Sequence, residues 1–142
     1  MKKIYMVLIA LIVATMAVAV VSAADMETKD IDGKFTIDVP KGTSFEEQTQ
    51  GAGRIFFSEE IGITIVYFAD PSINSTSVQS IYDAIAKDSD YTIQGTDGNV
   101  TTLTSNQGDG CIMATYKDGI YVTVSGTDKE LIKSMIDTVK FK

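Results

Sequence analysis

The sequence predicts an α+β domain: an antiparallel sheet of about six to eight strands with two helices packed on it, preceded by an N-terminal apolar helix. Three observations lead to this class. Short apolar segments are separated by turns that contain Asp-Gly pairs, which are typical of antiparallel hairpins. Only two segments after residue 23 have the apolar spacing of a helix. A parallel sheet needs a crossover helix after nearly every strand, so four strands, a helix, four strands and a helix favour antiparallel pairing.

Residues 1–23 have the order of a secretory signal. Two lysines precede the uncharged segment 4–21, and the small residues that follow predict cleavage after Ala23. Segment 4–21 is also long enough for a helix to span the hydrocarbon core, so an uncleaved membrane anchor with an external domain is the alternative. In both cases we expect the rest of the chain to be extracytoplasmic, either secreted or at the cell surface.

Residues 24–32 are polar and are expected to be a tether, so that a single domain covers 33–142. Its first strand is predicted at 35–39, where apolar and polar residues alternate before a Pro-Lys-Gly turn. The polar segment 44–49 is expected to form a weak strand at an edge of the sheet.

Two stronger strands are predicted at 54–58 and 62–68, joined by a hairpin turn. The second is apolar on both faces, which is typical of a central strand that is covered on both sides. The apolar spacing of a helix follows, in Val78, Ile81, Tyr82 and Ile85. The expected N-cap of this helix is Ser75, Thr76 or Ser77.

Two hairpins come next, and each is predicted to turn at an Asp-Gly pair, at 97–98 and at 118–119. Their strands are 91–94 with 100–104 and 110–117 with 120–125. Thr127 and Glu130 then have the spacing of a capping box, which predicts a helix with Thr127 at its N-cap. The apolar stripe of this helix is Leu131, Ile132, Met135, Ile136 and Val139. Residues 139–141 are expected to leave it as a short last strand.

Two segments resemble the PsbP-like superfamily. Residues 33–42 form an alternating strand that ends in Pro-x-Gly, and residues 130–141 form a helix that runs directly into a Lys-Phe strand. The resemblance covers most of 33–142, and its motifs are structural. It implies an antiparallel sheet sandwiched by helices and no catalytic residues, because the superfamily is mostly non-enzymatic. Its members include extrinsic photosystem subunits, a nuclear Ran-binding factor and small secreted bacterial domains.

The composition excludes several classes of function. The 142 residues include 12 basic and 19 acidic side chains, one Cys and no His. Without His, the Ser-His-Asp and Cys-His mechanisms and His-ligated metals are excluded. The net charge of −7 argues against nucleic acid as a partner, because binding it releases counterions through an excess of cations.

Acidic residues occur in two turns, at Asp30-Ile31-Asp32 and Asp88-Ser89-Asp90. Neither has the oxygen ligand and glycine that a calcium-binding EF-hand loop requires at its fifth and sixth positions, so solvated turn acids are expected. The pairs Glu46-Glu47 and Glu59-Glu60 raise the possibility of acid–base chemistry. Adjacent strand residues point to opposite faces, so a solvent-exposed charged surface is favoured. Cys111 is expected to be a buried thiol, since no His activates it.

Asn74 and Asn99 each begin an Asn-x-Ser/Thr sequence in a predicted loop, which makes them candidate glycosylation acceptors. No catalytic residue, metal ligand or cofactor site is predicted. The function expected from the sequence is that of a small exported, non-catalytic binding or assembly module, with another protein or an envelope component as its partner. A hydrolase that uses carboxylates alone is the alternative.

Overall fold

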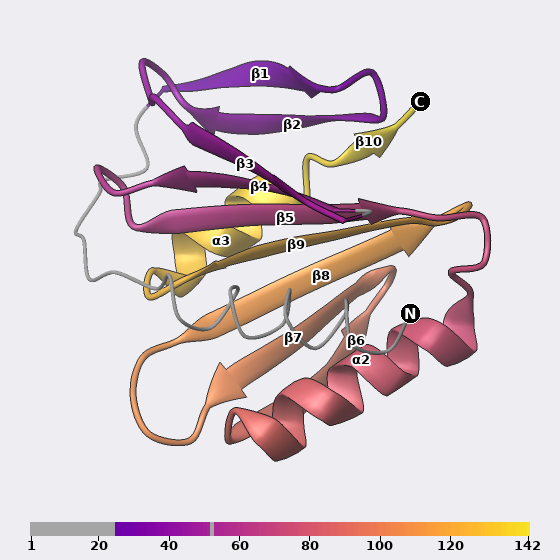
Figure 1. The fold of residues 1–142 in the computed structure, drawn as a ribbon. Coiled ribbons are helices and arrows are strands. Elements are labelled where there is room, and N and C mark those ends of the chain that lie inside the picture. Colours follow the sequence, from indigo (N-terminus) through magenta and orange to yellow (C-terminus); the bar gives the residue numbers. More distant parts are fainter. Residues whose placement is uncertain (1–24, 52) are drawn as a thin grey trace.

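The computed structural model describes residues 25–51 and 53–142, and the predicted signal or anchor segment with its cleavage site after Ala23 lies outside them. The described chain has an α+β fold, as predicted, with two helices and ten antiparallel strands (Figure 1). The strands are β1 (Met26–Ile31), β2 (Phe35–Pro40), β3 (Glu46–Gln50), β4 (Gly53–Ser58), β5 (Ile63–Ala69), β6 (Tyr91–Asp97), β7 (Val100–Ser105), β8 (Cys111–Lys117), β9 (Ile120–Gly126) and β10 (Lys140–Phe141). The helices are α2 (Ser75–Asp88) and α3 (Lys129–Ile136).

The strands form two sheets rather than the single sheet expected. Seven strands pair in the order β3-β4-β5-β9-β8-β7-β6, and three pair in the order β1-β2-β10. Strand β5 lies between β4 and β9 and is buried along nearly its whole length, which confirms the predicted central strand. Strand β3 lies at an edge, as expected from its polar sequence.

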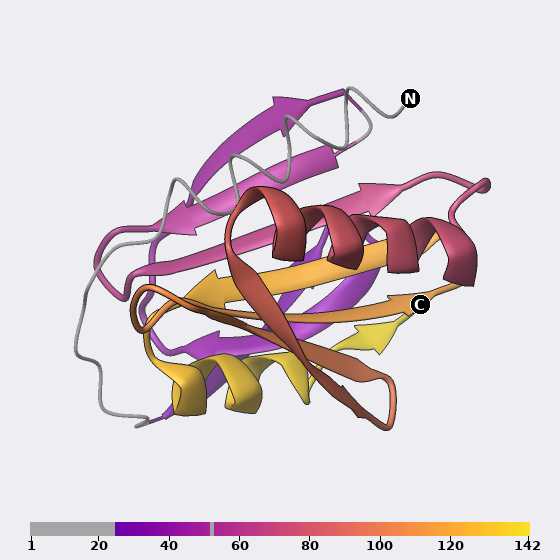
Figure 2. The ribbon, with the colours of Figure 1, turned by 90° about the horizontal axis from the view of Figure 1, so that it is seen from below.

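Each face of the seven-stranded sheet has its own apolar core. Helix α2 covers one face with Val78, Ile81, Tyr82 and Ile85, the four residues that the spacing predicted. The three-stranded sheet and α3 together cover the other face. Figure 2 shows the central strands of the seven-stranded sheet lying between the two helices. The molecule therefore has three layers, in which one outer layer is α2 and the other combines a helix with a small sheet.

The predicted tether is wrong for residues 26–31. These residues form β1, which pairs with β2 from Met26 opposite Pro40 to Ile31 opposite Phe35. Their polarity follows from the position of β1 at the edge of the small sheet, where Ile31 is the residue that is fully buried. The folded domain therefore includes residues 26–31, ahead of the predicted boundary at 33.

The two predicted Asp-Gly turns differ in outcome. Strands β8 and β9 turn at Asp118 and Gly119, both with positive φ (50° and 81°), as a type I′ turn requires. A side chain at position 119 would also meet the Asp70 carbonyl oxygen at 2.9 Å from its Cβ. In the β6–β7 hairpin, by contrast, pairing continues to Asp97 opposite Val100, so that the turn is one residue later, at 98–99.

The N-cap residue of each helix differs from the one that the sequence predicts. Asn74 caps α2, because its Oδ1 accepts hydrogen bonds from the backbone N–H groups of Thr76 and Ser77, each at 3.0 Å. Asp128 caps α3 by accepting from the N–H of Leu131 at 3.1 Å. Asn and Asp cap helices at least as well as Ser and Thr do. At both helices the N-cap is therefore an Asn or Asp next to the predicted Ser or Thr.

No helix among residues 25–51 and 53–142 is long and apolar enough to cross a membrane. Both apolar cores consist of residues from the same range. Because both cores lie within this range, we expect a chain that begins at Asp25 to fold and to unfold in one cooperative transition, measured by circular dichroism during thermal unfolding. Aggregation of this chain unless residues 4–21 are present would contradict the domain boundary.

Candidate functional site

A large hollow lies between the tip of the β6–β7 hairpin and the C-terminal end of α3. Its volume is about 730 Å³, and its lining includes Asn99, Tyr116, Lys117, Val139, Lys140 and Phe141. A second hollow of about 320 Å³ adjoins it, since Asp97 and Val100 line both. The second is lined further by residues 94–96 of β6 and by Lys129 and Lys133 of α3. We call the two together the hairpin–helix groove.

Five elements line this groove, namely β6, β7, β8, α3 and β10. Residues 94–97 belong to β6, whose register shifts between Ile93 and Gly95 in an irregularity of the β-bulge kind. Lys117 is the last residue of β8, before the Asp118-Gly119 turn. Lys140 and Phe141 form β10, which leaves α3 to pair with Thr36 and Phe35 of β2. The groove is thus bounded by a bulged edge strand and by the link from α3 to the small sheet.

The charge of the groove is opposite to that of the protein. Lys117, Lys129, Lys133 and Lys140 line it, which is four of the twelve basic residues of the chain. Only Asp97 and Asp137 of the nineteen acidic residues do so. Asp137 forms an ion pair with Lys133 at 3.0 Å, one helical turn away. All four lysines are exposed, so their ammonium groups are accessible to a ligand.

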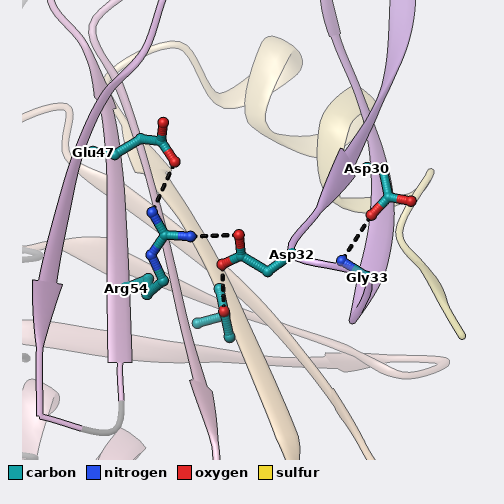
Figure 3. A network of polar contacts seen from close by, with 6 residues as sticks. Asp30, Asp32, Gly33, Glu47 and Arg54 are labelled. Atoms are coloured by element: carbon teal, nitrogen blue, oxygen red, sulfur yellow. Dashed lines mark hydrogen bonds and ion pairs between the residues drawn. The ribbon is translucent and has the colours of Figure 1, made fainter.

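A polar network around Arg54 joins the two sheets at another place (Figure 3). The guanidinium of Arg54 lies between Glu47 of β3 and Asp32 of the β1–β2 turn, and donates to both carboxylates. The Tyr67 hydroxyl donates to Asp32 at 2.5 Å. The Arg54 guanidinium also lies 5.0 Å from the centre of the Phe56 ring. Each partner of Arg54 is held by a different strand or turn, so the network fixes how the small sheet docks.

The pKa shifts in this network favour the charge states that hold its hydrogen bonds, namely an ionised Asp32 and a protonated Tyr67. The hydrogen bond from Tyr67 and the pairing with Arg54 lower the pKa of Asp32. Burial and the same hydrogen bond raise the pKa of Tyr67 to about 12, which keeps its hydroxyl protonated at neutral pH. The adjacent hollow holds about 190 Å³. A protonated tyrosine and two carboxylates that already share one arginine leave no free acid–base pair there.

Comparisons of the chain with models of protein families, with curated proteins and with solved structures found no match.

The acids of the two candidate calcium turns have other partners. Asp30 accepts from the N–H of Gly33 at 2.9 Å and pairs with Lys142, and Asp32 belongs to the Arg54 network. Asp90 accepts from the side chains of Asn106 and Gln107 at 2.9 and 2.6 Å. All three residues are exposed, as expected of solvated turn acids, and their contacts in addition fix neighbouring segments. Across residues 25–51 and 53–142 no group of acidic residues or Cys is arranged to hold a metal ion.

Excess calcium and a chelator are each expected to leave the melting temperature unchanged, because these turn carboxylates are already paired within the protein. Thermal unfolding followed by circular dichroism provides the measurement, with magnesium in place of calcium as the control for ionic strength. A tightly bound ion stabilises a fold by mass action. A rise of many degrees with calcium alone would therefore reveal a site in the chain and contradict this prediction.

The positions of the two glutamate pairs and of the cysteine show how each of these possible catalytic groups is used in the fold. Glu46 and Glu47 lie opposite Phe57 and Phe56 on β4, so they point to opposite faces as expected, and Glu47 binds Arg54. Glu59 and Glu60 are exposed in the turn between β4 and β5. Cys111 is 1% exposed, and burial raises the pKa of its thiol, which confirms the predicted buried cysteine.

Both candidate glycosylation acceptors are exposed, and they differ in their surroundings. Asn74 caps α2 through Oδ1, which leaves its nitrogen outside those hydrogen bonds. Asn99 lies in the β6–β7 turn and lines the hairpin–helix groove. A glycan on Asn99 would therefore stand at the opening of the groove, whereas one on Asn74 would not alter it. Whether either is modified stays a prediction of the sequence.

The lowered pKa of Asp32 predicts a loss of stability in acid. A carboxyl with a lower pKa in the folded state stabilises the fold above its unfolded pKa of about 3.9, and this contribution disappears as pH falls through the folded pKa. Asp32→Asn is therefore expected to lower stability at about pH 7 and to have a much smaller effect at about pH 2. Urea unfolding at the two pH values measures this. The matched change Asp109→Asn, at an exposed residue, should be nearly neutral at both, and an equal loss at both pH values for Asp32→Asn would contradict the prediction.

Proposed function

We propose that this chain is a small exported, non-catalytic binding or assembly module, and that the hairpin–helix groove is its binding site. The observation that carries the proposal is the groove itself. Its larger part, about 730 Å³, falls in the range of ligand-binding clefts, and it combines apolar walls with charged groups at the rim. The resemblance to PsbP-like domains supports a non-enzymatic role. Residues 1–23 would direct the domain out of the cytoplasm, or hold it at the membrane surface if they are not cleaved.

Site-specific photo-crosslinking tests this proposal. A photoreactive benzoylphenylalanine replaces Asn99, which lines the groove, or Glu59, which lies in the turn before β5, in the full chain expressed in its own cells. Residue 59 is a matched control, because it is also exposed in a turn and does not line the groove. We expect a discrete adduct from position 99 that position 59 does not give. Identical adducts from both positions, or none from position 99, would overturn the groove as the binding site.

A carboxylate-dependent hydrolase is the second candidate, because Asp97 and Asp137 both line the groove. Glycoside hydrolysis uses two carboxyls, one of which must carry a proton, and this requires an apolar environment for that group. Both residues are exposed, and Asp137 pairs with Lys133. We therefore expect no release of nitrophenol from nitrophenyl glycosides. Turnover by the natural chain that is lost in both Asp97→Asn and Asp137→Asn would replace the binding proposal with this one.

A further inference from the structure

We propose that the ligand of the hairpin–helix groove is an extended acidic segment of a partner protein. This inference rests on the proposed binding function and specifies its ligand. The first observation is the reversal of charge. A protein with a net charge of −7 places four lysines around one groove, on β8, α3 and β10. Elsewhere its acidic residues outnumber its basic ones, so the groove is where a negatively charged ligand meets attraction rather than repulsion.

The positions of the lysines favour an elongated ligand. Lys117 and Lys140 line the larger hollow, while Lys129 and Lys133 line the smaller one, and the two hollows adjoin at Asp97 and Val100. Positive charge therefore accompanies the groove through both parts instead of gathering at one point. A single small anion would engage one part only. A chain with carboxylates at intervals would meet cations along its whole length.

The walls between the lysines favour a peptide. Val139 and Phe141 are half-buried, so they offer apolar contact to side chains that alternate with the carboxylates. Residues 94–97 of β6 also line the groove, and β6 is the last strand of the seven-stranded sheet. Among the described residues its outer edge has no partner strand, which leaves backbone groups that a second extended chain can pair with. A polysaccharide has no backbone amides for such pairing.

The Lys133–Asp137 ion pair is compatible with this ligand. Its two side chains are 55% and 46% exposed, so the pair contributes little to stability and its lysine is accessible to an incoming carboxylate. Because all the contacts with the ligand charges are near solvent, binding should weaken steeply as salt is added.

Fluorescence anisotropy with a defined probe tests the inference. The probe is a labelled peptide of about eight residues in which glutamate alternates with valine, a pattern that suits an extended strand. It is titrated with the full chain in a non-ionic detergent, beside a control peptide with glutamine in place of glutamate. We expect the glutamate peptide to bind at least about tenfold more tightly, and the difference to shrink in high salt.

Two charge-matched double variants locate the site. Lys117→Gln with Lys140→Gln removes two groove lysines, and Lys41→Gln with Lys87→Gln removes two exposed lysines outside the groove. Thermal unfolding first establishes that both are folded. We expect the groove variant to bind the glutamate peptide about tenfold more weakly and the control variant to bind within about twofold of the natural chain. Equal weakening in both would show general charge attraction and would overturn the inference.

The remaining outcomes separate this inference from the proposed function. Equal affinity for the glutamate and glutamine peptides would overturn the acidic ligand and leave a peptide-binding groove. Tighter binding of polygalacturonate that depends on Lys117 and Lys140 would assign the groove to an anionic polysaccharide instead. Failure of every probe to bind at millimolar concentration would overturn the inference, while the photo-crosslinking at position 99 would still decide independently whether the groove binds a partner.

Discussion

Replacing Phe35 with alanine is expected to lower the free energy of unfolding by about 3–5 kcal/mol, the range found when a buried phenylalanine is truncated. The Phe35 side chain is fully buried. Its ring packs edge-on against Tyr67 of β5, with the ring centres 5.6 Å apart, and lies 6.4 Å from the ring of Phe141. It therefore connects the small sheet to the large one, and its truncation would leave a cavity between them.

Urea unfolding followed by circular dichroism measures this loss. Lys34→Ala, at the exposed residue next to Phe35, is the control and should change stability by less than about 0.5 kcal/mol. If both variants unfolded at the same urea concentration, the small sheet would not belong to the cooperative core. Packing of the small sheet on the large one would then contribute little to the free energy of unfolding.

Ile132→Ala is expected to lower the free energy of unfolding by about 2–5 kcal/mol, because Ile132 is completely buried between α3 and the sheet. Asp128→Ala should lower it by about 1 kcal/mol through loss of the helix cap. Lys133→Ala should have almost no effect, since its side chain is 55% exposed and its ion pair with Asp137 is at the surface. The same urea experiment gives all three values.

The order of these three variants is the test for α3. If Ile132→Ala unfolded no more easily than Lys133→Ala, the helix would be a loose attachment rather than part of an outer layer. The large effect expected for Ile132 also means that this variant must be compared under conditions where the natural chain is fully folded.

Elements that depend on local sequence could be predicted. The alternation in β2, the double-sided apolar pattern of β5 and the stripe of α2 each determine which residues are buried, whatever the partner element is. The Asp118-Gly119 turn follows in the same way from the conformations that these two residues allow. These features act over a few residues, so one sequence is sufficient to find them.

Features that depend on distant partners could not be predicted. Strand β1 is polar, and it forms because all six of its residues pair with β2. The lysines of the groove are at 117, 129, 133 and 140, and no spacing rule shows that a hairpin, a helix and a short strand bring them to one place. Arg54 gave one signal, as the only arginine in the chain, but its partners Asp32 and Glu47 are identified only by the docking of the two sheets.

The pairing of β10 with β2 determines when one apolar core can form during synthesis of the chain. The backbone N–H of Asp38 in β2 donates to the hydroxyl of Thr138, a residue 100 positions further along the chain. The cover over Phe35 therefore cannot close until residues 138–141 have left the ribosome. During synthesis the apolar surface around Phe35 therefore stays uncovered until α3 and β10 are free to pack on it, which leaves it accessible to chaperones for most of translation.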